Sequence, residues 1–183
     1  MKEKSFINFI FKTADNEDEF TQIHRLNYQT FVEEIPQHER NEEETLKDKF
    51  HEKNTYLILK KETELIGMVC TCDKRPFSIE KKLDDFESYL PKYKHIFETR
   101  LLVLKKEFRG MTFFGGLVKY WYEYWLEKGF DLTVVSGTLR QMKLYKHLGF
   151  IPFGHLVGTK EAPYQPMYLT LNNLKKYVEK LKR

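Results

Sequence analysis

The sequence predicts one mixed α/β domain that spans residues 1–183. A chain of this length suits a single hydrophobic core and is short for two. Hydrophobic residues make up 41% and aromatic residues 15% of the chain, which argues against disorder although 32% of the residues are charged. Strand-like and helix-like segments alternate without internal repeats or a low-complexity linker, which indicates helices layered on a sheet.

The first part of the chain predicts three strands and two helices. Residues 5–12 are rich in Phe and Ile and indicate a strand, and the acidic run 15–19 indicates the start of a helix. The highly charged segment 39–52 predicts a shallowly packed surface helix. Residues 54–60 and 64–73 predict an antiparallel hairpin, because a turn of only three residues separates them.

The second part predicts a long insert followed by alternating strands and helices. The polar insert 74–94 carries apolar residues at helical spacing, and residues 95–104 indicate the next strand. Residues 113–128 predict a helix that is apolar on almost every side and ends at a glycine. The run 131–136 indicates a short buried strand, and 138–148 indicates a further helix.

The last part predicts a hairpin and a final helix. Residues 150–157 and 164–171 form the hairpin, and the tail 173–183 reads as a basic amphipathic helix. The predicted order is therefore β-α-α-β-β-insert-β-α-β-α-β-β-α. This order is that of a mixed α/β domain.

Charge and cysteine content narrow the class of protein. The net charge of +4 suits an anionic cofactor and does not demand a nucleic acid, although the basic tail 175–183 keeps nucleic-acid binding as a weaker alternative. Cys70 and Cys72 lie in an apolar run, and the chain has no second cysteine pair to complete a zinc site. We therefore interpret them as reduced core residues of a protein in a reducing cytoplasm. We expect a cytoplasmic protein with no bound metal and no membrane partner.

The most informative stretch is 98–150, which reads as strand, basic turn, helix, strand and helix. Lys105, Lys106 and Arg109 precede a helix start, and cations beside the free N–H groups of a helix bind phosphate. The alternative is an ordinary solvated turn. Tyr145, one turn before the second helix ends, is a candidate proton donor.

The motifs LLVLKKEFRG, LTVVSGT, LYKHLGF and PMYLTL, together with the element order, resemble the GNAT superfamily of acyl-CoA-dependent N-acyltransferases. The resemblance covers nearly the whole chain as topology. It implies a central mixed, mostly antiparallel sheet of six to seven strands flanked by helices, with a helical insert between the third and fourth strands.

The resemblance also implies how acetyl-CoA or a longer acyl-CoA is held. In the family, a turn of pattern (Arg/Gln)-x-x-Gly-x-(Gly/Ala) binds the pyrophosphate, and the edge of the fourth strand pairs with the pantetheine and polarises the thioester carbonyl. Arg109 fits this pattern, whereas Thr112 and Phe114 stand where small residues are usual. The implied cofactor-binding residues are Leu102, Val103, Leu104, Arg109, Gly110, Met111, Thr112, Phe113, Phe114 and Gly115.

Two residues match the proton transfers of acyl transfer to an amine. The ammonium must lose a proton and the departing thiolate must gain one. Tyr145 matches the general acid of the family, and its alternative role is packing under the last hairpin. Glu98 is the candidate base, directly or through water, and its alternative role is a salt bridge to Arg100 on the same strand face.

A narrower resemblance points to the acyl-homoserine-lactone and N-acyl-amino-acid synthases. It rests on LNYQTFVEEIP, on the insert 74–94 and on the pair Glu98-x-Arg100. These relatives use long acyl groups, often from acyl carrier protein, and have degenerate pyrophosphate turns. Asn27 stands where their arginine is usual, and their Glu–Arg spacing is three rather than two.

The insert is the candidate substrate cover, because typical connections have about four to six residues. The alternative is a peripheral packed flap. The candidate substrate-binding residues are Phe31, Arg75, Phe77, Arg100 and Ser136.

The sequence thus predicts an N-acyltransferase that moves an acyl group, most simply acetyl, to a primary amine of a small molecule or peptide by direct attack. Two alternatives remain open: a long-chain synthase that uses acyl-CoA or acyl carrier protein, and a non-catalytic acyl-CoA sensor. The aromatic helix and final hairpin also leave room for a homodimer.

Overall fold

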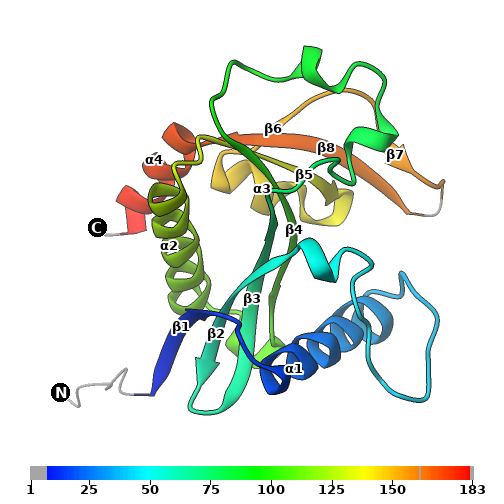
Figure 1. Cartoon of the computed structure of the whole chain (residues 1–183), viewed down its shortest axis with the longest axis vertical. Coiled ribbons are helices and arrows are strands. Elements are labelled where there is room, and N and C mark those ends of the chain that lie inside the picture. The colour runs from blue at the N-terminus through cyan, green and yellow to red at the C-terminus, as the bar shows by residue number, and fades with distance from the viewer. Residues whose placement is uncertain (1–7, 161, 182–183) are drawn as a thin grey trace. The chain divides into compact units, whose positions relative to one another are not determined.

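The computed structural model describes residues 8–160 and 162–181. These residues form an eight-stranded sheet with the strand order β1-β2-β3-β4-β5-β8-β6, and β7 pairs with β8 beside it (Figure 1). The strands are β1 Phe9–Thr13, β2 Thr55–Lys61, β3 Glu64–Cys72, β4 Ile96–Leu104, β5 Leu132–Thr138, β6 Ile151–Pro152, β7 Val157–Gly158 and β8 Pro163–Thr170. The pairing of β4 with β5 is parallel, whereas β1–β2, β5–β8, β6–β8 and β7–β8 are antiparallel. The predicted mixed α/β fold is confirmed.

Helices flank this sheet in the described part of the chain. They are α1 Glu17–Tyr28, α2 Met111–Lys128, α3 Met142–Leu148 and α4 Leu171–Leu181. A π-helical turn, Gln29–Glu34, continues α1. The predicted acidic start of α1 is confirmed, because the Asn16 side chain accepts a hydrogen bond of 3.0 Å from the Glu19 backbone N–H.

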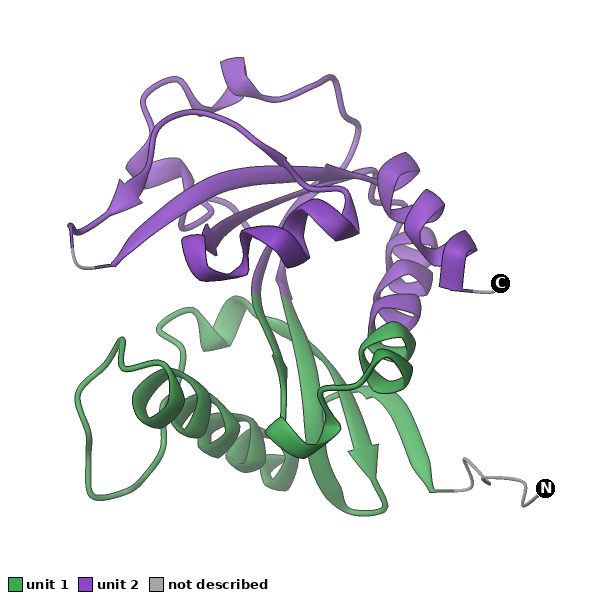
Figure 2. Cartoon of the chain, turned by 180° about the vertical axis from the view of Figure 1, so that it is seen from behind, with its two compact units in different colours: residues 1–70, 101–117 green, residues 71–100, 118–183 purple. Residues whose placement is uncertain are grey.

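The chain forms two compact units (Figure 2). Unit 1 contains residues 1–70 and 101–117, and unit 2 contains residues 71–100 and 118–183. The boundaries fall within β3, β4 and α2, so these three elements contribute residues to both units.

Unit 1 has a core between α1 and the sheet. Ile23 and Leu26 of α1 pack with Ile58 of β2, Met68 of β3 and Val103 of β4, and all five side chains are buried. The only fully buried carboxylate beside this core, among the described residues of unit 1, is that of Glu19. It is neutralised by Lys60 at 2.9 Å and Lys12 at 3.1 Å.

Unit 2 has a core on each face of its part of the sheet. Phe97 of β4 contacts Trp125 edge-on at 4.9 Å, and Trp125 contacts Trp121 at 5.2 Å, which packs α2 on one face. Side chains alternate along a strand, so the next residue, Glu98, points to the opposite face. There Val134 of β5 packs with a cluster of insert and hairpin residues: Phe77, Ile79, Leu83, Phe86, Phe153 and Val157.

The predicted helix 39–52 is wrong, because the segment is irregular up to a short 3-10 turn at His51–Lys53. Asparagine and aspartate side chains satisfy the backbone there in place of helical bonds. The Asn41 side chain bonds both the N–H and the C=O of Thr45, and Asp48 accepts from the Phe50 N–H.

The predicted helix in the insert is replaced by two 3-10 turns, Glu80–Lys82 and Phe86–Tyr89. Asp85 separates them with a left-handed backbone, φ 50°, which interrupts any continuous helix. The apolar spacing nevertheless identifies core residues, since Leu83 and Phe86 are buried in the core of unit 2. The predicted strand 150–157 is likewise divided into β6 and β7.

Candidate active site

The predicted phosphate-binding turn lies in unit 1, where β4 leads into α2. The Lys105 N–H donates to Ile66 O at 2.9 Å, and a 3-10 turn, Lys106–Phe108, leads to Gly110. The Phe114 N–H donates to Gly110 O at 3.1 Å, which is the first backbone bond of α2. Because the first N–H groups of a helix have no partner within the helix, this end of an 18-residue helix favours an anion.

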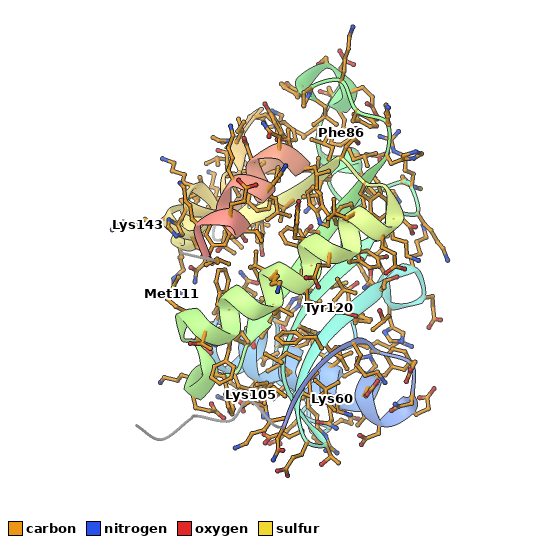
Figure 3. All side chains as sticks on the ribbon, turned by 90° about the vertical axis from the view of Figure 1, so that its left-hand side faces the viewer. Lys60, Phe86, Lys105, Met111, Tyr120 and Lys143 are labelled. Carbon is orange, nitrogen blue, oxygen red and sulfur yellow. The ribbon has the colours of Figure 1, made fainter. Side chains whose placement is uncertain are left out.

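The surroundings of this helix start leave it open. No atom lies within 4 Å of the position that a Cβ on Gly110 would occupy, apart from the neighbouring residues. Met111 and Thr112 are exposed, and Figure 3 labels Met111 at the start of α2 and Lys105 in the turn before it. Phe113 packs against Phe9 at 4.9 Å between ring centroids, so its ring is part of an aromatic cluster. Phe114 is half-buried and Gly115 is buried.

The guanidinium of Arg109 is hydrogen-bonded to other groups of the protein. Its Nε donates to Leu104 O at 2.9 Å, and its Nη2 donates to Glu34 Oε2 at 2.6 Å. The Nη1 group bonds the second Glu34 oxygen. The guanidinium lowers the pKa of the Glu34 carboxyl, and the carboxylate raises the pKa of Arg109, so both groups are charged at neutral pH.

The predicted edge segment, Leu102–Leu104, completes β4 in unit 1. Val103 and Leu104 are buried, and Val103 belongs to the core described above. Their side chains therefore serve packing, and only the backbone is suited to bind a pantetheine amide. Phe31, a candidate for the acceptor, packs half-buried against the same core.

Glu98 lies in unit 2, where it connects β4 to the insert. Its side chain is 3% exposed and accepts hydrogen bonds from Ser78 Oγ at 2.5 Å, from Ser78 N at 3.0 Å and from Ile79 N at 3.2 Å. Arg100 Nη1 donates to it at 3.2 Å. The structure thus contains the salt bridge that was the alternative to the base role, together with a connection to the insert that sequence analysis missed.

Tyr145 lies on α3 in unit 2, with its ring against β5. Burial raises the pKa of Tyr145 to about 12, and a hydrogen bond with the Thr138 backbone opposes this rise. The hydroxyl therefore keeps its proton at neutral pH, as a general acid requires. Phe150 contacts the ring edge-on at 5.5 Å between centroids.

Gly137 provides the space for this ring. A Cβ at Gly137 would lie 2.6 Å from Tyr145 Cε2 and would also collide with the end of Met167. The backbone of Gly137 is not left-handed, so its importance is the space it leaves. Sequence analysis missed this residue, although LTVVSGT contains it.

Three further candidates are in unit 2. Ser136 Oγ is buried and has no hydrogen-bond partner among the described residues, as expected of a group that meets a ligand or water. Arg75 pairs with Glu80 at 2.8 Å and with Glu87, and Phe77 is 1% exposed. Arg75 and Phe77 thus hold the insert together. Phe77 is closed to a substrate, whereas the Arg75 side chain is exposed and already paired with two carboxylates.

The described residues contain neither a metal-binding cluster nor a membrane-spanning helix. No group of three or more His, Cys, Asp or Glu side chains is arranged to hold a metal ion. No helix there is long and apolar enough to cross a membrane.

Comparisons with known proteins agree with this architecture. The family model of the acetyltransferase (GNAT) domain matches residues 26–119, just over half of the chain. The structure resembles BjaI, a CoA-dependent acyl-homoserine lactone synthase solved with SAM and isopentyl-CoA, with a TM-score of 0.79 and 16% identity over 95% of this chain and 90% of BjaI.

Two other solved structures extend the comparison. FeeM, an N-acyl amino acid synthase from uncultured soil microbes, has a TM-score of 0.68 and 16% identity over 95% of this chain and 97% of FeeM. An acyl-CoA N-acyltransferase from Pseudomonas aeruginosa has a TM-score of 0.59 and 13% identity over 87% of this chain and 98% of that protein. Among curated proteins, none matches significantly.

At these identities the solved structures show a shared fold, and the family model shows membership. The resemblance stated from the sequence is confirmed. The chain therefore belongs to the acetyltransferase (GNAT) domain family and is an acyltransferase.

Proposed function

We propose that this protein transfers an acyl group from an acyl-CoA-type thioester to the primary amine of a small molecule by direct attack. The observation that carries the proposal is Tyr145, a half-buried tyrosine whose ring is seated on Gly137 and whose pKa is raised to about 12. Such a group holds a proton at neutral pH and is suited to give it to a leaving thiolate.

The ammonium of the acceptor loses a proton, directly or through water, to the base, for which Glu98 is our candidate. The amine nitrogen then bonds to the thioester carbon, the carbon–sulfur bond breaks, and the thiolate takes the proton of Tyr145. The nitrogen loses its second proton as the amide forms, and that proton, directly or through water, restores the tyrosine hydroxyl. The N–H groups at the start of α2 beside Gly110 hold a donor phosphate, and the backbone of Leu102–Leu104 binds the pantetheine.

A donor with an acyl chain longer than acetyl is the second candidate. It is supported by the similarity to BjaI, which was solved with isopentyl-CoA, at a TM-score of 0.79, against 0.59 for the acyl-CoA N-acyltransferase. The buried Ser136 hydroxyl, which has no hydrogen-bond partner within residues 8–160 and 162–181, offers a polar contact for such a substrate.

Thiol release from acetyl-CoA and isopentyl-CoA over a panel of amines tests the proposal. We expect turnover with at least one pair, and we expect Tyr145→Phe to lower kcat by about 10² or more because the proton donor is removed. Tyr124→Phe is the matched control, since Tyr124 lies on α2 and its ring contacts Phe130 at 6.1 Å between centroids. A Tyr145→Phe enzyme with the kcat of the wild type would refute the acid role.

A further inference from the structure

The turn that leads into α2 carries as many negative as positive groups once its ion-pair partners are included. Lys105 Nζ lies 2.5 Å from Glu64 Oε1, and Arg109 is bound by Glu34. Lys106 and Glu107 between them are exposed. In the described part of unit 1, the charges of this turn and its partners therefore balance: Lys105, Lys106 and Arg109 against Glu34, Glu64 and Glu107.

The Glu34–Arg109 pair is a well-formed one. Both terminal nitrogens of the guanidinium bond the two oxygens of one carboxylate, and the remaining Nε bonds Leu104 O. Planar pairs of this kind match the geometry by which arginine binds phosphate. Glu34 thus occupies the face of Arg109 that a donor phosphate would use.

The local fold explains how Glu34 reaches Arg109 across 75 residues of sequence. Glu34 is the last residue of the π-helical turn that continues α1, and the Ile35 N–H donates to Thr30 O at 2.9 Å, five residues back. A π turn inserts one residue per turn relative to an α-helix and so rotates the residues that follow it. The side chains of Glu34 and Arg109 are 40% and 38% exposed, so a solute can reach the pair.

We propose that Glu34 is a specificity-determining residue: it neutralises Arg109 and so weakens the protein's preference for CoA. CoA carries three phosphate groups, and the competing donor is a pantetheine thioester with a single phosphate. The inference rests on the proposed use of a pantetheine thioester. The single phosphate is held by the N–H groups at the start of α2, which need no side-chain charge. Free 4′-phosphopantetheine and the same group on an acyl carrier protein share this chemistry.

Equilibrium binding to four full-length variants tests the inference without requiring turnover. Isothermal titration calorimetry gives the Kd of CoA and of 4′-phosphopantetheine for the wild type, Glu34→Gln, Arg109→Gln and the double variant. The double variant is the matched control, because it restores the net charge of the wild type. An apo carrier protein and its phosphopantetheinylated form, titrated in the same way, distinguish the two sources of the single phosphate.

We expect the preference for CoA to follow the charge of the turn. We define the preference ratio as the Kd of 4′-phosphopantetheine divided by the Kd of CoA, so that a higher ratio means a stronger preference for CoA. Glu34→Gln should raise this ratio by about fivefold at low salt, as expected for one exposed charge. The double variant should return to the wild-type ratio, and Arg109→Gln should fall below it. Added salt should shrink these differences, since exposed charges are screened.

Two outcomes would overturn the inference. One is a ratio that stays constant across the four variants. The other is a double variant that loses CoA affinity by more than about tenfold relative to the wild type, since a phosphate contact made by Arg109 in the wild type would produce it. If binding follows the charge while no amine is acylated, the inference stands and the proposed function fails.

Discussion

Gly137 and Tyr145 show how one missing side chain positions another. The ring of Tyr145 occupies the space that a Cβ at Gly137 would fill. We expect Gly137→Ala to displace the ring and to lower kcat by about tenfold to hundredfold, because a shift of about 1 Å in a catalytic group has effects of this size. Steady-state kinetics of the purified variant measures the loss.

A double-mutant cycle separates positioning from general damage. If Gly137 acts through the hydroxyl of Tyr145, Gly137→Ala should change kcat by less than about twofold in a Tyr145→Phe background. Equal losses in both backgrounds, with a lowered melting temperature in both, would instead assign Gly137 a structural role alone.

The pH dependence of the rate tests the acid itself. Burial raises the pKa of Tyr145 to about 12, so the hydroxyl stays protonated from neutral pH to about pH 10. We expect kcat to show no loss in that range that depends on Tyr145. A fall with an apparent pKa near the ordinary value of about 10, absent from Tyr145→Phe, would contradict the assignment.

At the level of elements, the insert depends on a hydrogen-bonded carboxylate. Ser78→Ala removes one donor from Glu98, whose side chain is 3% exposed, and should lower the free energy of unfolding by about 1–3 kcal/mol. Urea denaturation measures this loss. Ser88→Ala is the control on the same insert, because Ser88 Oγ donates only to Asp85 O in an exposed turn. Equal effects of the two substitutions would argue against a special role for Glu98.

Sequence reasoning succeeded where the signal was local. The hairpin of β2 and β3, the helix α2 and the strand β5 follow from apolar spacing and turn residues. It failed at 39–52, because charge and spacing do not reveal that Asn41 and Asp48 bond the backbone themselves. For the candidate site, the motif supplied Arg109 and Tyr145 as candidates, and their roles stay predictions. Their partners Glu34 and Gly137 could not be predicted, because one is 75 residues away and the other is defined by empty space.

At the scale of the whole molecule, the free energy of unfolding should depend on pH through the protonation of His24. The side chain of His24 is half-buried, and its Nε2 lies 3.4 Å from His51 Nδ1. Burial lowers the pKa of His24 most, the positive charges of His51 and Lys47 lower it further, and Glu17 raises it. The unfolded chain therefore binds the proton more readily than the folded one. The stability contributed by neutral His24 is present above the unfolded pKa, about 6.5, and is lost as the pH falls through the lower folded value.

We accordingly expect the melting temperature to fall between about pH 7 and pH 5, and His24→Asn to flatten this dependence. Differential scanning calorimetry of both proteins across this range measures it. His38→Asn, at an exposed position, is the control and should retain the slope of the wild type. A slope that survives in His24→Asn would assign the effect to other groups.

The two tryptophans of the chain, Trp121 and Trp125, both lie in the buried contact with Phe97 in unit 2. Intrinsic tryptophan emission is therefore an optical signal of unit 2 alone, while His24 and the Glu34–Arg109 pair lie in unit 1, which contains no tryptophan. Emission compared with circular dichroism during unfolding will show whether the units melt together, since coincident transitions mark a two-state protein. A change in tryptophan emission on adding a ligand that binds at the turn of unit 1 would report a change in the surroundings of Trp121 and Trp125 in unit 2.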